Sequence, residues 1–356
     1  MPVPATFKAA VLHEPGARHT VEERSLGPLE PGEIAVKITA TAINPIDWKI
    51  RDLGWWIKKY PIVLGSDAAG EVAELGPDVS NVEVGDRVFF QGIIGSVDHS
   101  TFQQYARIPA ALVSKTPPIS DEAAAGVHLA TMAALVGFYD SSGRGLPAPW
   151  DHDGDRVGSH KAIIILGGSS SVGQYAIQLA GRSGFELIVT NASATHKELL
   201  TKLGTNVVLD RSPKEGANAF RDALGEIPLD FVFDAISSAE TQKLGVEILQ
   251  AAGPASGRQL VTVLDEDAEA LALARSQEPA VEIKHVIGLG SAPNLRYLSE
   301  PFAKHIGGPN GWIGLHLFRP NSVTVVEGGL AKLDEALDKN KRGVSGEKVI
   351  IRPWDE

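Results

Sequence analysis

A strand, a glycine-rich turn and a helix follow one another in KAIIILGGSSSVGQYAIQLAGRSG, residues 161–184. The apolar run at 162–166 is typical of a strand buried on both faces, and apolar residues recur at helical spacing after the turn. Four shorter β-branched runs, ELIVTN, NVVLD, DFVFDAI and QLVTVL, then alternate with helical segments. Strands that alternate with helices predict a parallel sheet with helices on both faces, so we expect a doubly wound α/β domain here.

The glycine turn GGSSSVG at 167–173 lies where a dinucleotide-binding turn belongs, between a buried strand and a helix. Backbone N–H groups and the positive end of the helix dipole face an anion at such a turn. The spacing departs from a strict G-x-G-x-x-G because serines occupy places where glycine can stand, which leaves an ordinary tight turn as the alternative. The residues predicted to bind the cofactor here are Gly168, Ser169, Ser170, Ser171, Val172 and Gly173.

The second strand of the alternation ends about twenty residues after the turn, where an NADH site commonly places Asp or Glu for the ribose 2′-hydroxyl. This chain offers hydroxyl, amide and basic side chains instead, and these can bind a 2′-phosphate through charge-assisted hydrogen bonds. They are Asn191, Ser193, His196, Lys197 and Arg211. The sequence therefore favours NADPH over NADH. For Lys197 taken alone, a place on a solvated helix face is an equally good interpretation.

The first third of the chain has a different pattern. Residues 32–43 and 68–90 are rich in Val and Ile and contain Gly-Pro-Asp and Val-Gly-Asp turn signals, which predicts a twisted antiparallel β domain. The C-terminal stretch 328–354 reads as a helix, a turn and a strand that return to this domain. We expect one domain to comprise 1–130 and 306–356, and the doubly wound domain to comprise 131–305.

Composition excludes several classes of protein. The chain has no cysteine, which rules out disulfides, thiolate nucleophiles and cysteine-ligated zinc. Its net charge of −11 disfavours nucleic acid and anionic membranes as partners. We find neither an apolar run of the ~20 residues that a membrane helix needs nor a signal peptide in the first residues, so we expect a cytoplasmic protein.

Motifs spread along nearly the whole chain point to one known superfamily. Besides the glycine turn, they are AINPIDWKIR (42–51), LGSDAAGEV (64–72), VEVGDRVF (82–89), FQQYARIP (102–109) and VSGEKVIIR (344–352). With them the chain resembles the medium-chain dehydrogenase/reductase superfamily, which joins a GroES-like β domain to a Rossmann domain. In zinc-dependent members the first two segments carry a cysteine and a His-Glu pair, whereas this chain has Ile43-Asn44-Pro45 and Ser66-Asp67. The resemblance therefore implies a zinc-independent enzyme, and we expect no metal-binding residues.

Within the superfamily, the INPIDWK segment, the insertion at 141–160 and the C-terminal segment look most like fungal trans-acting enoyl reductases and their ToxD-like relatives. That resemblance implies NADPH-dependent reduction of an enoyl thioester carried by a polyketide synthase. In this chemistry a hydrogen-bond donor at the carbonyl oxygen can replace a metal. The alternatives are a free-standing quinone or enone reductase and a non-catalytic nucleotide-binding protein. The insertion could cover a sheet edge, which favours a monomer over a dimer.

The resemblance also implies roles for individual residues. Lys49, the lysine of the INPxDxK motif, is expected to donate to the thioester oxygen, with a solvated surface lysine as the alternative. Asn44 and Asp47 are expected to order the loop around it, and a place near the nicotinamide is the alternative for Asn44. Thr131 matches a threonine that contacts the nicotinamide carboxamide, although a shift of one residue would place Met132 there. The expected cofactor-wall residues are Ile236, Leu289 and Gly290. The run Trp55–Tyr60 combines aromatic and basic residues that suit an acyl chain with an anionic carrier, or simple packing against the β domain.

Overall fold

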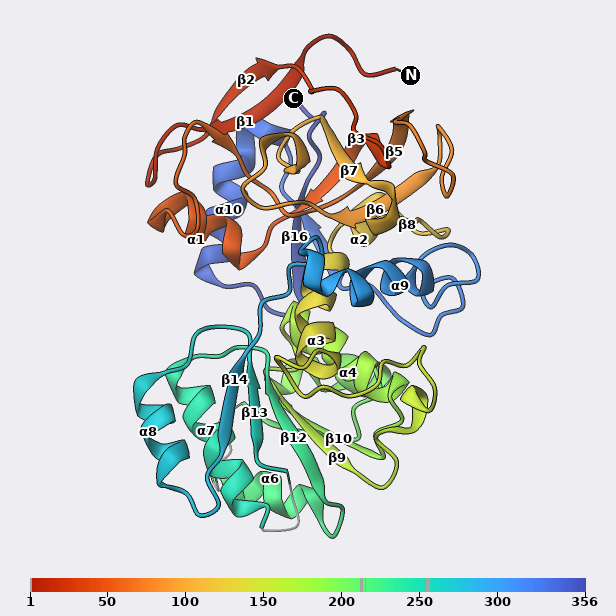
Figure 1. Cartoon of the computed structure of the whole chain (residues 1–356). Coiled ribbons are helices and arrows are strands. Elements are labelled where there is room, and N and C mark those ends of the chain that lie inside the picture. Colours follow the sequence, from red (N-terminus) through yellow and green to blue (C-terminus); the bar gives the residue numbers. More distant parts are fainter. Residues whose placement is uncertain (1, 212–213, 215, 254–256) are drawn as a thin grey trace. The chain divides into compact units, whose positions relative to one another are not determined.

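The computed structural model describes residues 2–211, 214, 216–253 and 257–356. The chain divides into two compact units (Figure 1), which we call the β unit and the parallel-sheet unit. The β unit comprises Met1–Leu129 and Leu289–Glu356, and the parallel-sheet unit comprises Ala130–Gly288. The return to the β unit comes at Leu289 and not at residue 306, because α9 (Arg296–Ile306) packs against β8 (Ser114–Lys115) of that unit.

The parallel-sheet unit is built on six parallel strands, as the alternation of strands and helices predicts. Their order is β11-β10-β9-β12-β13-β14. The strands are β9 (Ala162–Leu166), β10 (Leu187–Ala192), β11 (Val207–Asp210), β12 (Leu229–Asp234), β13 (Gln259–Thr262) and β14 (Glu282–His285). From β9 the chain adds β10 and β11 on one side of the sheet, and from β12 it adds β13 and β14 on the other side. Because the crossovers are right-handed, their helices lie on one face in the first half and on the opposite face in the second. This is the doubly wound Rossmann-type arrangement.

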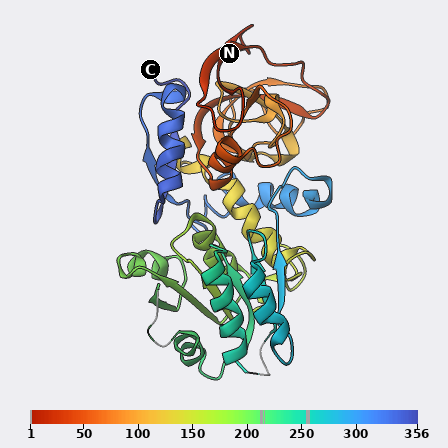
Figure 2. The same ribbon diagram turned by 90° about the vertical axis from the view of Figure 1, so that its left-hand side faces the viewer.

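Helices cover both faces of this sheet (Figures 1 and 2). On one face, Phe220 and Val246 pack with Ile164 and Val232 in one buried cluster. On the other face, the Phe138 ring lies 5.2 Å from Phe231 and 5.3 Å from Phe233. The helices are α3 (His128–Tyr139), α4 (Ser171–Arg182), α5 (Lys197–Lys202), α6 (Ala217–Leu224), α7 (Ala239–Ala251) and α8 (Ala268–Ser276). Alternate side chains of a strand such as β12 are thus buried against helices on opposite faces of the sheet.

The β unit contains two sheets, largely antiparallel as expected, and matches the GroES-like β domain. The larger sheet has the order β15-β16-β3-β5-β6-β8, with β7 paired to β3, and the smaller has the order β2-β1-β4. Their strands are β1 (Phe7–Leu12), β2 (Thr20–Arg24), β3 (Glu33–Ala42), β4 (Ile62–Val63), β5 (Asp67–Leu75), β6 (Arg87–Gln91), β7 (Tyr105–Pro109), β8 (Ser114–Lys115), β15 (Ser322–Val325) and β16 (Glu347–Ile351).

Strand β3 is central because it has β16 on one side and β5 on the other. The antiparallel register pairs Ile350 with Ala42, and Ala68 with Thr41. The helix α1 (Pro45–Leu53) begins directly after β3, and α10 (Leu333–Arg342) packs beside it. The end of β3 is therefore the place where the first residues of α1 meet segments from distant parts of the sequence.

One stretch, Asp121–Tyr139, is long and apolar enough by composition to cross a membrane, but 78% of its most apolar window is buried inside the protein. The stretch comprises two helices: α2 (Asp121–Ala125), capped by the Ser120 hydroxyl, and α3. They are separated at Gly126 and Val127. A long apolar segment that is mostly buried is typical of core helices.

Candidate active site

The glycine turn is tight because a side chain would collide at each of its glycines. A Cβ on Gly167, which has a φ of +76°, would lie 2.3 Å from Ile236 Cγ1. A Cβ on Gly168 would lie 2.2 Å from Thr190 Oγ1, and one on Gly173 would lie 2.3 Å from the Gly167 carbonyl oxygen. The absence of side chains brings the start of α4 close to β9. The contact at Gly173 is a close approach of backbone to backbone, which a dinucleotide-binding turn requires.

The serines of the turn use part of their hydrogen-bonding capacity within the protein. Ser170 is the N-cap of α4, and its hydroxyl accepts a hydrogen bond of 3.0 Å from the Gly173 N–H. Ser169 is buried, and its carbonyl oxygen accepts from Gln174. Ser171 and Val172 open the helix and are half-buried. Since the first N–H groups of a helix have no partner inside it, this turn offers backbone donors to an anion.

Asn191 braces the turn from the end of β10. Its Oδ1 accepts a 2.8 Å hydrogen bond from the Gly167 N–H, and its Nδ2 donates to the Arg211 carbonyl oxygen at 3.2 Å. The side chain is buried. Its amide is thus committed to the backbone on both sides, which the prediction of a ligand-binding role did not foresee.

The other residues predicted to bind the adenosine end gather at the carboxyl edge of the sheet. The register pairs Ala192 of β10 with Asp210 of β11, so Ser193 and Arg211 follow adjacent strands. Ser193 and His196 are half-buried, whereas Lys197 and Arg211 are exposed. One exposed carboxylate, Asp210, ends β11 beside them. Ligands of doubly wound sheets bind at this edge.

The remaining cofactor predictions fall in different places. Ile236 stands at the same edge against Gly167, with its side chain 41% exposed. Thr131 and Met132 lie in α3 and are buried. Leu289 and Gly290 belong to the β unit. There the Gly290 N–H donates to Gln91 Oε1 at 2.9 Å.

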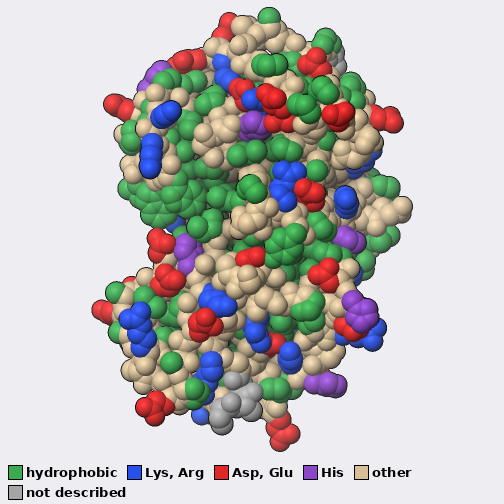
Figure 3. Space-filling view, in the orientation of Figure 1, with side chains coloured by type: hydrophobic (Ala, Val, Ile, Leu, Met, Phe, Trp, Pro, Cys, Tyr) green, Lys and Arg blue, Asp and Glu red, His purple; other side chains and the backbone are tan. Residues whose placement is uncertain are grey.

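Lys49 lies on α1 against aromatic rings. Its Nζ is 4.9 Å from the centroid of the Trp55 ring and 5.8 Å from that of Trp48, and its side chain is half-buried. Lys341 approaches the Trp48 ring at 5.6 Å. Such cation–π contacts hold a charged head without neutralising it. Figure 3 shows hydrophobic side chains gathered over α1. The last residue of this helix, Leu53, is exposed.

The first residues of α1 sit in a buried polar network. The Asn44 N–H donates to Asp47 Oδ2 at 2.8 Å, and the Ser66 hydroxyl donates to Asp47 Oδ1 at 3.2 Å. The Asn44 side chain donates to Asp67 Oδ2 at 3.2 Å and accepts from Lys348 Nζ at 2.5 Å. Burial raises the pKa of both Asp47 and Asp67 to about 7, and it lowers the pKa of Lys348. Where the sequence predicts a loop around Lys49, the structure has the start of α1, with Asn44 as its N-cap and Asp47 in its first turn.

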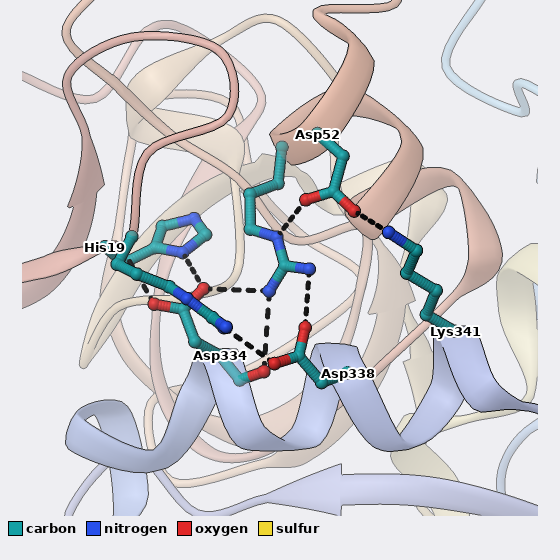
Figure 4. A network of polar contacts seen from close by, with 7 residues as sticks. His19, Asp52, Asp334, Asp338 and Lys341 are labelled. Carbon is teal, nitrogen blue, oxygen red and sulfur yellow. Dashed lines mark hydrogen bonds and ion pairs between the residues drawn. The ribbon is translucent and has the colours of Figure 1, made fainter.

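A second network clamps α1 to α10 (Figure 4). Arg51 is 3% exposed, and its guanidinium donates to Asp52 at 2.6 Å, Asp334 at 3.1 Å and Asp338 at 2.7 Å. Asp334 also accepts from the ring of His19 at 2.9 Å. These bonds fix the last turn of α1, just after Lys49.

The clamp predicts an acid-sensitive contribution to stability. Burial acts to raise the pKa of Asp334, but hydrogen bonds from His19 and Arg51 outweigh it and lower the pKa from 3.8 to about 2. Because the folded-state pKa is the lower one, this stabilisation is present above the unfolded-state pKa and is lost as pH falls through the folded-state pKa. We expect roughly 2 kcal/mol of unfolding free energy to disappear between about pH 4 and pH 2. Urea unfolding across this range measures it, and an equal loss in Asp334→Asn would contradict the assignment.

Sequence reasoning missed Lys348 and Arg51, and gave Asp67 no role. The available signal for Lys348 was its place in the apolar strand EKVII, where a lysine is unusual unless paired. Arg51 lies four residues after Asp47 on the same short helix, a spacing that favours an ion pair, although the acidic partners it binds are Asp52, Asp334 and Asp338. Among the residues that the structure describes, no three His, Asp or Glu side chains are grouped closely enough to hold a metal ion.

Comparison with known proteins agrees with this geometry. Residues 30–118 match the family model "Alcohol dehydrogenase GroES-like domain", and residues 171–275 match "Zinc-binding dehydrogenase". The chain is 30% identical to the trans-enoyl reductase himH of Aspergillus japonicus over 90% of this chain and 89% of that one. It is also 30% identical to the trans-enoyl reductase tndF of Aspergillus flavipes, over 97% and 98%.

The fold is shared with solved structures. An alcohol dehydrogenase superfamily protein from Novosphingobium aromaticivorans matches with a TM-score of 0.75 at 22% identity, over 97% of this chain and 99% of that one. The glycine turn, which leads into the N-terminus of α4 and its backbone N–H donors, fits the pyrophosphate of a nicotinamide dinucleotide. The chain belongs to the medium-chain dehydrogenase/reductase family and is an oxidoreductase that uses a nicotinamide cofactor.

Proposed function

We propose that this reductase uses NADPH to reduce the activated C=C bond of an enoyl thioester and that it does so without zinc. The observation that carries the proposal is the Lys49 ammonium, held 4.9 Å from the Trp55 ring on a helix fixed at both ends by polar networks. A fixed, half-buried cation suits a reaction in which negative charge develops on one oxygen atom. The names of the two curated relatives support the same reaction class.

The chemistry assigns Lys49 one task. When bound, a reduced nicotinamide would supply the hydride that adds to the β-carbon of the substrate. The π electrons of the C=C bond then shift toward the carbonyl, and negative charge builds on the thioester oxygen. The Lys49 ammonium donates a hydrogen bond to that oxygen, which lowers the energy of the enolate, and a proton from water completes the saturated product at the α-carbon.

The residues at the carboxyl edge support the choice of NADPH. Arg211 and Lys197 are exposed beside the half-buried Ser193, an arrangement that fits a 2′-phosphate. We expect Arg211→Ala to raise the KM for NADPH by about tenfold, equivalent to one charge-assisted hydrogen bond of ~1.4 kcal/mol, and to leave the KM for NADH nearly unchanged. Steady-state kinetics with both cofactors checks this. An equal change for both would place Arg211 outside the 2′-phosphate site.

The proposal includes a carrier-borne substrate. The segment Trp55–Tyr60 joins aromatic residues to the exposed Lys58 and Lys59, and Trp56 is 54% exposed. Such a surface complements an apolar acyl chain on an acidic carrier of the kind found in polyketide synthases, even though the chain as a whole carries a net charge of −11. A cytoplasmic monomer is part of the same proposal.

The deciding experiment follows NADPH oxidation with two competing acceptors, an α,β-unsaturated acyl-pantetheine thioester and a small quinone. Preferential turnover of the thioester supports the proposal. Preferential turnover of the quinone would assign the chain to the quinone reductases of the family. Cofactor binding without turnover of either would leave a nucleotide-binding protein.

A further inference from the structure

Two strands that flank β3 bring buried charges to its end. Extending the register that pairs Ile350 with Ala42 places Lys348 opposite Asn44, and the Ile43 N–H indeed donates to the Val349 carbonyl oxygen at 2.9 Å. On the other side of β3, the Thr41 hydroxyl donates to the Asp67 carbonyl oxygen at 2.8 Å. The strands β16 and β5, which flank β3, therefore place the Lys348 ammonium and the Asp67 carboxylate on either side of the Asn44 side-chain amide.

Lys348 is fixed in this position. Its side chain is 4% exposed, and its stem packs on Gly126, where a Cβ would lie 2.7 Å from Lys348 Cγ. The ammonium is 2.5 Å from Asn44 Oδ1 and 3.9 Å from Asp67 Oδ2. Burial raises the pKa of Asp47 and Asp67, and the positive charge of Lys348 opposes that rise at both. Buried carboxylates need such a partner to remain ionised.

These residues do not fit zinc. Cysteine, histidine and carboxylate ligands are what zinc prefers, and the two segments that carry such ligands in zinc-dependent relatives supply Asn44, Ser66 and Asp67 here. An amide and a hydroxyl are poor zinc ligands, and a buried ammonium at hydrogen-bonding distance repels a divalent cation. The positive charge at this place is instead built into the chain.

We propose that Lys348 takes the place of a metal ion and acts as a positioning residue for Lys49. Through Asn44 it fixes the start of α1, which carries Lys49. Through Asp67 it also fixes the start of α3, because Asp67 Oδ1 accepts a 2.9 Å hydrogen bond from the Leu129 N–H. The part that concerns Lys49 rests on the proposed function, whereas the ordering of the two helix starts does not.

Hydrogen–deuterium exchange tests the ordering without any substrate. We expect Lys348→Met to increase exchange in peptides that cover 42–53 and 126–133, and to leave exchange in α6 of the parallel-sheet unit unchanged. Lys332→Met is the matched control, because Lys332 is an exposed lysine paired with Glu335 at 3.1 Å. Unchanged exchange in both helix starts would overturn the inference, whatever reaction the enzyme performs.

A double-mutant cycle tests the action through Lys49. We expect Lys348→Met to lower kcat for the enoyl thioester by about tenfold, because small misplacements of a catalytic group cost that much or more, and to keep the Kd for NADPH. In a Lys49→Met background the same change should lower kcat less than about twofold. A tenfold loss in both backgrounds would overturn the positioning role. If the wild type did not turn over the thioester, the proposed function would fail. The exchange measurement would then still decide whether Lys348 orders the two helix starts.

A second variant protects the test against misfolding. Lys348→Met leaves two buried carboxylates without a cation, whereas Lys348→Met with Asp67→Asn removes one charge of each sign. Asparagine can still accept from the Leu129 N–H through its oxygen. We expect the double variant to fold and to show the increased exchange at 42–53, because the bond to Asn44 is lost. Wild-type exchange and wild-type kcat in this variant would contradict the inference.

Discussion

Replacing Lys49 with methionine is expected to lower kcat for an enoyl thioester by about a hundredfold, with a much smaller change in KM. Loss of one donor to a developing oxyanion typically costs a factor of 10²–10³. Methionine keeps an unbranched apolar stem, so packing on the Trp55 ring is retained while the ammonium is removed. Single-turnover measurements with saturating NADPH isolate the chemical step.

The control for this experiment is Lys115→Met. Lys115 is a half-exposed lysine of the same unit, paired with Asp86 at 2.7 Å. We expect the Lys115→Met variant to keep kcat within about twofold of the wild type, because surface ion pairs contribute little to stability. If Lys49→Met retained kcat within about threefold, another group would have to supply the donor. Quinone reduction that survives the change would support the same conclusion.

Replacing Arg51 with methionine is expected to destabilise the β unit by about 3 kcal/mol. Removing one partner of a buried ion pair costs ~3–5 kcal/mol because the other charge is left buried. The low end of that range applies because the side chains of Asp334 and Asp338 are 18% and 28% exposed, and water can reach them. Arg18→Met is the matched control, since Arg18 bonds to the same Asp338 but is 64% exposed. We expect it to cost less than about 1 kcal/mol.

Tryptophan fluorescence during urea unfolding reports mainly on the β unit, which contains Arg51. The chain has 6 tryptophans, of which Trp150 alone lies in the parallel-sheet unit. The others, in the β unit, are Trp48, Trp55, Trp56, Trp312 and Trp354. If Arg51→Met and Arg18→Met shifted the urea-unfolding midpoint equally, burial of the guanidinium would not determine how much it contributes to the free energy of unfolding.

The parallel-sheet unit could be predicted from sequence because its signals are local. Each strand is a short apolar run next to a helix, and right-handed crossovers leave few possible strand orders. The collisions at Gly168 and Gly173 were likewise implied by a turn that must bring a helix close to a strand. What could not be predicted was that Ser170 and Asn191 would bond to backbone groups of the turn itself. Both side chains satisfy N–H groups that a tight turn leaves without backbone partners.

The site in the β unit was only half predictable, for a physical reason. The INPIDWK motif identified Asn44, Asp47 and Lys49 because they are close in sequence. Lys348, which bonds to Asn44, is 304 residues away from it in the sequence, and only the register of β16 on β3 brings the two together. A register is set by the whole sheet, because a slip of one residue would turn Lys348 to the opposite face.

The position of β16 also has a consequence for the order in which the protein is made. A ribosome completes β3, β5 and β7 early, then synthesises the whole parallel-sheet unit, and only afterwards delivers β16, which pairs with Thr41 and Ala42 at the end of β3. The inserted unit can fold on its own contacts while the end of β3 still lacks its pairing with β16, since domains generally fold as units during synthesis. Asp67 and Asn44 acquire their cation in the last step. Under the proposed role of Lys348, the start of α1 therefore becomes ordered only after the parallel-sheet unit has been synthesised.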